Sequence, residues 1–350
     1  MHLPYDGVIL INVGSPASPE IADVAAFLKK FLTDKYVISL PWLWRQILIR
    51  GVIIPFRKRK SAAMYQRLWR NSGETFPLVE TMERLTVLLE SHLCLPIVSA
   101  MRYGAPSVQT ALRTLRKKNT HELKCLLVVP LFPQFALSGY HTAAEHALSE
   151  IRTLLGNQIR IDVLPPFYKS EKYISAVCDV IRPDLERRGC KHLLLAFHSI
   201  PVSHLHKASV LFTGHTHSSL CCASGSLEAE VCYQYQCIES SRLISERLNI
   251  EGLEVETVFQ SQMGHSTWLG PSLKKRLAEL AGKGFRQVSV ASPGLVCDCL
   301  ETLDEIGERE KEAFLSLGGE SLQLLPCLNA SQQWVEALAD IIEDYAESLS

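Results

Sequence analysis

The residues best able to do chemistry lie at the ends of two apolar segments in the second half of the chain. His198 closes the run HLLLAFH and is followed by Ser-Ile-Pro, so its imidazole is expected at the end of a buried strand. Histidine accepts a proton readily near neutral pH, and ligands of α/β proteins bind at the carboxyl ends of parallel strands. His198 is therefore a candidate general base or metal ligand, with a hydrogen-bonded core histidine as the alternative.

A row of carboxylates follows another apolar segment, in SPGLVCDCLETLDEIGE. The row falls at spacings of three, four and three positions and consists of Asp298, Glu301, Glu305 and Glu308. On an α-helix this spacing predicts a single face, with apolar residues on the other. A solvated acidic face near a helix N-terminus is one interpretation, because the helix dipole favours carboxylates there. The other is a path for a cation or for protons, since the row starts at the end of a buried strand.

The stretch SLCCASGSLEAEVCYQYQC holds the densest group of potential ligands. It contains four of the eleven cysteines of the chain, namely Cys221, Cys222, Cys232 and Cys237. Four thiolates can hold an iron–sulfur cluster. Zinc bound by these thiolates, or by cysteine with His215 and His217, is an alternative. A redox-responsive or simply exposed loop is another.

Composition narrows the class of protein. The chain has 350 residues, 47% of them hydrophobic and 21% charged, which is ordinary for one large domain or two smaller ones. A net charge of −1 gives no field that would attract nucleic acid, so no such partner is expected. The N-terminus lacks a secretory signal pattern, and no apolar run reaches the ~20 residues that span a bilayer. We therefore expect a cytoplasmic protein with reduced thiols.

Short apolar segments alternate with helical patterns along the chain. Most of these segments are apolar at nearly every position, which is typical of strands buried on both faces of a parallel sheet. The alternation of strands and helices predicts a doubly wound α/β fold. The expected strands are residues 8–13, 97–103, 125–132, 161–166, 192–199, 255–261, 288–294 and 322–329.

We expect these strands to form two Rossmann-like halves with the active cleft between them, each half a four-stranded parallel sheet flanked by helices. The change of half is expected near Pro165-Pro166, which gives residues 1–165 and 166–330. Residues 331–350 form an amphipathic helix that is expected to pack back on the first half. Residues 203–237 are rich in His, Ser and Cys, and we expect them to form an insert in the second half.

Residues 37–60, called the apolar lip below, interrupt the alternation. The segment VISLPWLWRQILIRGVIIPF is strongly apolar between Pro41 and Pro55, carries two arginines and continues into the basic run RKRK. A buried helix is one interpretation. The other is an amphipathic segment that lies on a membrane surface, with the basic run meeting anionic headgroups.

Several motifs, in one order along the chain, resemble the ferrochelatase family. LLLAFHSIP is similar to its catalytic-histidine signature, SPGLVCDCLETLDEI to its acidic motif, and FQSQMGHSTWLGP to a strand and loop of the family. VILINVGSP, FLKKFLTDKYVISLP, SAMRYGAPS and VVPLFPQF also fit. The resemblance runs from about residue 8 to 330, apart from residues 203–231. It implies insertion of Fe²⁺ into protoporphyrin IX with release of two protons, the last step of haem biosynthesis.

The resemblance also implies roles for individual residues. His198 would be the base or an iron ligand at one face of the macrocycle, with Glu301 opposite, and Asp298, Glu305 and Glu308 would extend a metal or proton path. The implied porphyrin contacts are Val13, Tyr65, Arg102, Tyr103 and Trp268, with core packing as the alternative for each aromatic ring. Coproporphyrin-using members have a tyrosine where this chain has Val13, which favours protoporphyrin IX. Coproporphyrin III, Co²⁺ or Zn²⁺, and a binding module without turnover remain alternatives.

The chain departs from the family pattern at two places. NSGETFP stands where the family usually has Gly-Gly-Ser-Pro, and the connection between His198 and Cys237 is longer than in most members. The longer loop resembles that of bacterial members with a [2Fe–2S] cluster, which implies a cluster on Cys221, Cys222, Cys232 and Cys237. The implied partners are protoporphyrin IX, Fe²⁺ and the inner membrane surface, bound peripherally, with a homodimer left open.

Overall fold

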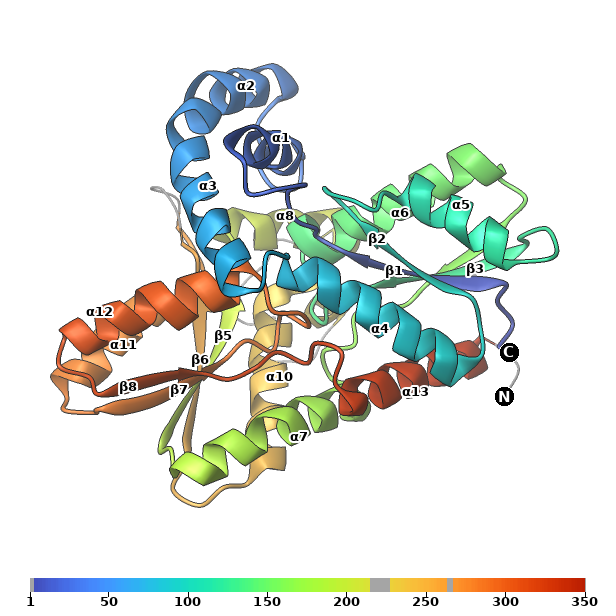
Figure 1. Ribbon diagram of the computed structural model, residues 1–350. Helices are drawn as coiled ribbons and strands as arrows, with labels where there is room; N and C mark the ends of the chain where they lie inside the picture. The colour runs from blue at the N-terminus through green and yellow to red at the C-terminus, as the bar shows by residue number, and fades with distance from the viewer. Residues whose placement is uncertain (1–2, 215–226, 263–266, 350) are drawn as a thin grey trace. The chain divides into compact units, whose positions relative to one another are not determined.

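The computed structural model describes residues 3–214, 227–262 and 267–349 (Figure 1). Its strands form two four-stranded sheets, in the orders β2-β1-β3-β4 and β6-β5-β7-β8. All strand pairs within them are parallel. The expected fold of two parallel four-stranded sheets flanked by helices is confirmed. The chain divides into unit 1, with Met1–Leu131, Leu137–Pro165 and Ile342–Ser350, and unit 2, with Phe132–Ala136 and Pro166–Ile341.

The sheet of unit 1 is built around β1, whose six residues are all buried. Its strands are β1 (Gly7–Asn12), β2 (Ile97–Met101), β3 (Cys125–Pro130) and β4 (Arg160–Val163). Parallel neighbours require crossover connections, and helices supply them. These helices are α1 (Ile21–Leu32), α2 (Trp42–Ile47), η1 (Leu48–Ile53), α3 (Ile54–Asn71), α4 (Pro77–Leu93), α5 (Val108–Lys118), η2 (Leu137–His141) and α6 (Thr142–Leu155).

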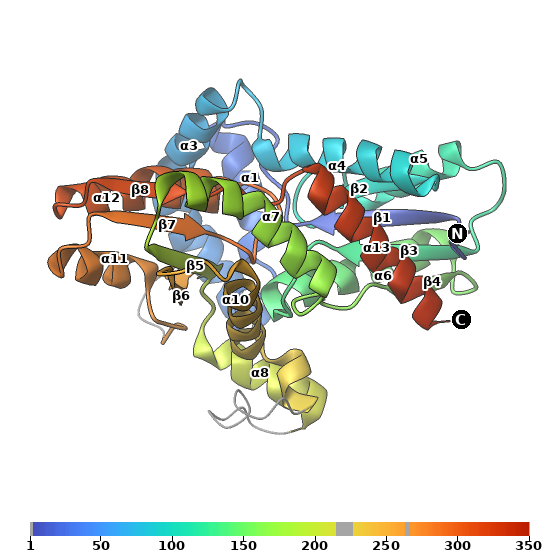
Figure 2. The same ribbon diagram turned by 90° about the horizontal axis from the view of Figure 1, so that it is seen from below.

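The sheet of unit 2 has β5 at its centre, paired with β6 and β7. Its strands are β5 (His192–His198), β6 (Glu254–Gln260), β7 (Gln287–Ala291) and β8 (Ser321–Leu324). The helices of this unit are α7 (Glu171–Arg188), α8 (Val202–Thr213), η3 (Leu227–Val231), α10 (Tyr233–Leu248), α11 (Leu273–Gly282), η4 (Glu301–Glu310) and α12 (Lys311–Ser316). They can be followed from a second direction in Figure 2.

One face of the second sheet packs against α11, η4 and α12. Leu194, Val258 and Val290 point to this face and are fully buried, in one cluster with Leu277 of α11 and Phe314 of α12. Burying each such side chain contributes about 1.5–3 kcal/mol. The apolar continuity of these strands thus fixes the sheet, and the sheet in turn fixes the positions of the residues at its carboxyl edge.

The last helix, α13 (Gln332–Ser348), is shared between the two units. Its buried Trp334 packs on the rings of Phe167 and Tyr173, with ring centroids 5.7 and 6.3 Å away, all within unit 2. The helix residues through Ile341 belong to unit 2, and those from Ile342 onwards belong to unit 1.

The apolar lip forms one continuous helical segment from α2 through η1 into α3. We expected the helix to lie between Pro41 and Pro55, but it runs past Pro55, which occupies the first turn of α3. The π-helical stretch η1 comes directly before this proline. Proline lacks an N–H and crowds the carbonyl four residues earlier, and a wider turn relieves both problems. Among the described helices, none is both long enough and apolar enough to cross a bilayer.

Candidate functional site

His198 is the last residue of β5 and lies opposite Gln260 of β6 in the sheet register. The Tyr233 hydroxyl donates to the His198 carbonyl at 2.9 Å, and the Ser199 N–H donates to the Gln260 carbonyl at 2.8 Å. The backbone at His198 is therefore fixed on both sides. The side chain is half-buried, so the imidazole is held at the carboxyl edge of the sheet and remains accessible.

Trp268 is held beside the segment that follows His198. The two segments pair antiparallel: Leu269 N–H donates to the Ile200 carbonyl at 3.1 Å, and Trp268 bridges Pro201. The buried indole Nε1–H of Trp268 has no hydrogen-bond partner in the part of the chain that the structure describes. The structure thus places Trp268 opposite Pro201, three residues after His198.

Glu301 begins the ten-residue helix η4, which is a π-helix rather than the expected α-helix. A π-helix has about 4.4 residues per turn, because its hydrogen bonds run from i to i+5. By this winding, Glu301, Glu305 and Glu310 share a face, whereas Glu308 points about 150° away from Glu301. The burial pattern agrees, since Glu308 is exposed and the other three are half-buried. The expected single face of Asp298, Glu301, Glu305 and Glu308 is therefore not the face that forms; a metal-binding role for Glu308 stays a prediction.

The carboxylates along η4 differ in their surroundings. Ser261 donates its hydroxyl proton to Glu305 Oε2 at 2.7 Å, and Arg309 Nη2 lies 3.6 Å from the same oxygen. Burial, followed by the negative charge of Glu305, raises the pKa of Glu310 above its ordinary value. Glu310 therefore holds a proton more readily than an ordinary glutamate does. Sequence reasoning missed it because the α-helical spacing excludes position 310.

Asp298 is used to fix the start of η4. Its carboxylate accepts hydrogen bonds from the Thr302 hydroxyl at 2.9 Å and from Asn329 Nδ2 at 2.7 Å. Its own N–H donates to Asn329 Oδ1 at 2.8 Å. Asp298 therefore ties the helix that carries Glu301 to the segment after β8. This is a positioning role, and metal binding by Asp298 stays a prediction.

Gln260 links the strand of His198 to the helix of Glu301. Its side chain is buried, with 2% of the residue exposed, and its Nε2 lies 3.5 Å from the Glu301 carbonyl oxygen as a weak donor. Its Oε1 has no hydrogen-bond partner among the described residues. His198, Gln260 and Glu301 therefore meet at the carboxyl edge of the second sheet. A polar residue that closes an apolar strand next to that of His198 was the signal that could have identified Gln260.

In unit 1, the residues that follow β1 and β2 lie side by side at the carboxyl edge of the first sheet. The Arg102 N–H donates to the Asn12 carbonyl at 2.8 Å, and the Tyr103 N–H donates to the Val13 carbonyl at 3.0 Å. The predicted porphyrin contacts Val13, Arg102 and Tyr103 are thereby neighbours. Gly104 follows directly, and a Cβ at this position would lie 2.6 Å from the Ser15 carbonyl oxygen, so the close approach of the two turns requires glycine.

Asp34 organises this edge, and sequence reasoning gave it no role. Its Oδ2 accepts hydrogen bonds from Arg102 Nη2 at 2.7 Å, the Tyr103 hydroxyl at 2.8 Å and the Thr142 hydroxyl at 2.6 Å. Burial opposes the charge, but the hydrogen bonds and Arg102 outweigh it, so the pKa of Asp34 lies below its ordinary value. A buried anion thus fixes the Arg102 guanidinium. Asp34 follows an amphipathic helix in FLTDKYV, where a lone acid gives no sign of its distant partners.

The two predicted porphyrin-contacting tyrosines lie among buried rings. Tyr65 meets Phe27 and Phe76 edge to face, with centroids 6.2 and 5.7 Å away, and Tyr103 meets Phe31 at 5.2 Å. Both tyrosines are less than a tenth exposed. This is the arrangement that the packing alternative predicts, and contact of either ring with a porphyrin stays a prediction.

Two of the four predicted cluster ligands, Cys221 and Cys222, lie outside the described residues. Cys232 precedes α10 and its Sγ accepts a hydrogen bond from the Tyr235 N–H at 3.5 Å, as an N-cap. Cys237 is fully buried; burial raises the pKa of its thiol well above the ordinary value, and a hydrogen bond with Tyr233 offsets part of this rise.

The two described cysteines lie in different surroundings. Cys232 is the extended residue that caps α10, whereas Cys237 lies on the helix itself. Cys232 lies within the insert, directly before α10, whereas the Cys237 thiol is buried in the core. A cluster that uses both residues would draw one ligand from the fully buried Cys237.

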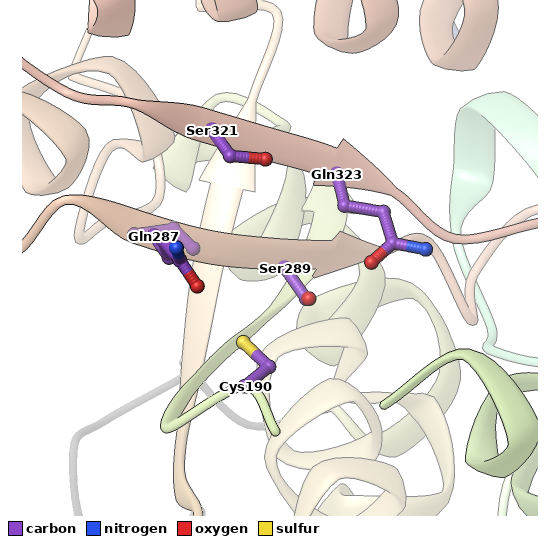
Figure 3. A pocket seen from close by; sticks show the side chains of 6 residues that line it. Cys190, Gln287, Ser289, Ser321 and Gln323 are labelled. Atoms are coloured by element: carbon purple, nitrogen blue, oxygen red, sulfur yellow. The ribbon is translucent and has the colours of Figure 1, made fainter. Parts of the chain in front are cut away.

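A polar cavity of about 310 Å³ lies elsewhere in unit 2, and Figure 3 shows the side chains around it. They come from the first three residues of β7 and of β8 and from the segment before β5, and are Cys190, Gln287, Ser289, Ser321 and Gln323. This is the amino edge of the sheet, opposite to His198. Ligand sites of parallel sheets lie at the carboxyl edge, so we do not assign the reaction to this cavity.

Known proteins resemble the chain over nearly its whole length. The family model "Ferrochelatase" matches residues 5–346. The ferrochelatase of Porphyromonas gingivalis is 41% identical over 337 residues, covering 96% of this chain and 95% of that protein. The ferrochelatase of Ectopseudomonas mendocina is 40% identical and covers 98% of both chains. Among solved structures, SirB from Bacillus subtilis with Fe³⁺ has a TM-score of 0.52 at 13% identity, covering 97% of this chain and 95% of that one, a likeness in fold alone. The chain belongs to the ferrochelatase family.

Proposed function

We propose that this ferrochelatase inserts Fe²⁺ into protoporphyrin IX and releases two protons, with His198 and Glu301 as the reacting groups. The observation that carries the proposal is that His198 pairs with Gln260 in the strand register and that the Gln260 side chain reaches the main chain of Glu301, so that both residues lie at the carboxyl edge of the second sheet. Fe²⁺ is a substrate here, so its ligands need only hold it in transit. The alternative of a binding module without turnover has no use for a base beside an acidic helix.

The chemistry requires a base close to the metal. A free-base porphyrin carries two inward N–H protons, and the metal enters as they leave. A neutral imidazole accepts such a proton near pH 7. His198 is half-buried, and a hydrogen bond from Tyr233 to its carbonyl holds the backbone that carries the ring. Glu301 stands at the first position of η4, and its carboxylate is an oxygen ligand of the kind that can hold Fe²⁺ in transit.

We propose that the face of η4 with Glu301, Glu305 and Glu310 carries protons away from the site. The raised pKa of Glu310 supports this, because a carboxyl group that takes up a proton more readily than usual is suited to pass one on. Arg309, 2.9 Å from Asp304 and 3.6 Å from Glu305, places a fixed positive charge beside the face. This charge disfavours the passage of a divalent cation more than the passage of a proton.

For the porphyrin, we propose that Arg102 binds a propionate and that Trp268 stacks on the macrocycle. A guanidinium fixed by Asp34 is pre-organised for a carboxylate, and the planar indole suits a planar ring. Val13 adds only an apolar side chain to this edge, in keeping with a substrate that has vinyl groups where coproporphyrin III has charged propionates.

The choice of porphyrin can be measured directly. With Fe²⁺ under anaerobic conditions, kcat/KM is expected to be at least about tenfold higher for protoporphyrin IX than for coproporphyrin III, because a charged group buried against Val13 would lose its hydration. Initial rates of metalloporphyrin formation with each porphyrin give the ratio. Equal rates, or a preference for coproporphyrin III, would contradict the assignment of protoporphyrin IX.

We further propose that the apolar lip rests on a membrane surface. Seven of its large apolar side chains are exposed, whereas Arg45 is buried and donates to the carbonyls of Ile38 and Leu40 at 3.3 and 3.0 Å. This inverts the usual pattern of a helix in water. The exposed side chains are Leu40, Trp42, Leu43, Trp44, Ile47, Val52 and Phe56. The adjoining basic run, residues 57–60, supplies attraction to anionic headgroups.

We also propose that the insert carries a [2Fe–2S] cluster on Cys221, Cys222, Cys232 and Cys237. What supports it is the four local thiols and the position of Cys232 within the insert, directly before α10. The buried state of Cys237 is the main argument against the full set. Zinc or a metal-free loop are the other outcomes.

The cluster proposal predicts a coloured protein. Anaerobically purified protein is expected to absorb in the visible range and to lose this absorption on reduction, and Cys232→Ser and Cys237→Ser should each remove it. Cys190→Ser, a buried cysteine outside the insert, is the control and should keep the colour. A colourless preparation supplied with iron and sulfide contradicts the cluster, and colour retained in Cys237→Ser excludes Cys237 as a ligand.

A further inference from the structure

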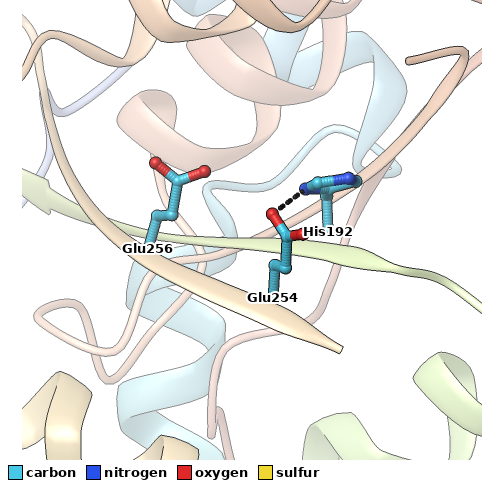
Figure 4. A group of neighbouring side chains, drawn as sticks. All are labelled: His192, Glu254 and Glu256. Atoms are coloured by element: carbon cyan, nitrogen blue, oxygen red, sulfur yellow. Dashed lines mark ion pairs between the residues drawn. The ribbon is translucent and has the colours of Figure 1, made fainter. Parts of the chain in front are cut away.

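A buried histidine and two glutamates meet at the amino edge of the second sheet, at the opposite end of β5 from His198. His192 begins β5 and lies opposite Glu254 in the register, and Glu256 follows two residues along β6 on the same side. Figure 4 shows the three side chains on one side of the two strands. One ligand atom from each lies within 4.8 Å of the others. Six strand steps of about 3.3 Å put this group roughly 20 Å from His198.

The unusual feature of His192 is the environment of its Nδ1 atom. Its side chain is 4% exposed, and Nδ1 has no hydrogen-bond partner among the described residues. The ring is fixed by Phe285, whose centroid lies 4.0 Å away. Leaving a buried polar atom without a partner costs about 1–3 kcal/mol. The nitrogen faces Glu254 Oε2 at 3.4 Å, which is long for a hydrogen bond.

The 3.4 Å between Nδ1 of His192 and Oε2 of Glu254 is the separation expected for two ligands of one metal ion. Nitrogen and oxygen ligands lie about 2.0–2.2 Å from zinc, so two ligands of a tetrahedral ion are roughly 3.4 Å apart. The distance between Nδ1 of His192 and Oε2 of Glu254 matches this value. We propose that His192, Glu254 and Glu256 form an accessory site for a divalent cation, with zinc as the preferred ion and water in the fourth position.

Arg276 is the group that competes with this cation. Its guanidinium binds both oxygens of Glu256 at 2.7 Å and also lies 2.9 Å from Glu279. A carboxylate that binds arginine through both oxygens still has lone pairs on its outer side. Glu256 can therefore join the metal while it stays paired, or release Arg276 to Glu279. Either way, removal of the guanidinium frees Glu256 and should strengthen the site.

The chemistry of the site points to zinc rather than to magnesium or calcium. An imidazole with two carboxylates is a zinc ligand set, whereas magnesium and calcium prefer oxygen ligands alone. Among first-row divalent ions, Mn²⁺ and Fe²⁺ bind nitrogen and oxygen sites most weakly and Cu²⁺ binds them most tightly, so the tetrahedral spacing of the ligands, more than affinity alone, favours zinc. A cation here would join the starts of β5 and β6, and would neutralise two adjacent carboxylates. It lies off the path of the reaction, so its effect is on stability.

The test measures Zn²⁺ binding to the full chain after removal of metals, by equilibrium dialysis and by the rise in Tm. The unmodified chain is expected to bind one more Zn²⁺ than Glu254→Gln or His192→Gln. Glu254 is exposed, so its variant should fold normally. Glu251→Gln, an exposed glutamate just before β6, is the matched control and should keep the full number of ions. The difference is expected to persist when all of these chains carry His198→Ala, which separates it from metal bound at the reaction site.

A second variant tests the role of Glu256. In Arg276→Gln the Kd for this Zn²⁺ should fall by at least threefold, because the competing cation is gone. The same number of ions in all variants, or equal Zn²⁺-induced Tm rises in the unmodified chain and Glu254→Gln, would overturn the site. Unchanged or weaker binding in Arg276→Gln would overturn Glu256 as a ligand.

Discussion

In His198→Ala, kcat/KM for Fe²⁺ insertion into protoporphyrin IX is expected to fall by roughly 10²–10⁴, while the porphyrin still binds. The imidazole lies at the carboxyl edge of β5, and it is the group that accepts pyrrole protons in the proposed mechanism. Its backbone is held by Tyr233 and Gln260 independently of the ring, so alanine leaves the edge in place. Initial rates under anaerobic conditions, together with porphyrin fluorescence titration, separate catalysis from binding.

Glu301→Gln is expected to act in the same way, because glutamine keeps the shape of the side chain but neither binds Fe²⁺ strongly nor accepts a proton. Glu312→Gln is the matched control: it lies in α12, directly after η4, is exposed and should retain the normal rate. A rate within threefold of normal in both His198→Ala and Glu301→Gln would refute the assigned chemistry. Loss of porphyrin binding in either would show that the residue holds the substrate instead.

Replacing Trp42 and Trp44 together with serine is expected to reduce binding to anionic phospholipid vesicles by at least about tenfold. The two indoles are 67% and 64% exposed, and burying an aromatic side chain contributes about 1.5–3 kcal/mol. Sedimentation with vesicles measures the bound fraction. Val87→Ser, an apolar residue 67% exposed on α4 and outside the apolar lip, is the control and should bind as the unmodified chain does.

Changing the charge of the vesicles separates the contribution of the exposed indoles from that of the basic residues. Basic residues near an anionic surface contribute about 1 kcal/mol each, so binding should weaken with neutral lipid or with high salt, and should weaken further in the double tryptophan variant. Equal vesicle binding by the tryptophan variant and by Val87→Ser would contradict the membrane role of the apolar lip.

The fold could be predicted because its strands are unusually clear. Segments such as 125–130 and 192–198 are apolar at almost every position, which only a sheet covered on both faces accommodates. The place of His198 at the carboxyl end of a strand could be predicted for the same reason, since it is the polar residue that ends such a strand. The position of Trp268 could not be predicted from a local pattern, because it depends on an antiparallel pairing with the segment that follows His198.

The parts of the site that sequence missed depend on winding and on contacts between distant residues. The carboxylates of residues 298–308 fit an α-helical period, but η4 is a π-helix, and the change of period exchanges Glu308 for Glu310 on the face of Glu301. Asp34 acts through Arg102 and Thr142, which are 68 and 108 positions away. No local pattern of residue types could reveal such partners.

The most direct test of the account mixes the purified chain with Fe²⁺ and protoporphyrin IX under anaerobic conditions and measures haem formed and protons released. The account predicts many haem molecules per protein molecule and two protons per haem, with turnover lost in Glu301→Gln. Tight binding of protoporphyrin without formation of haem would contradict it.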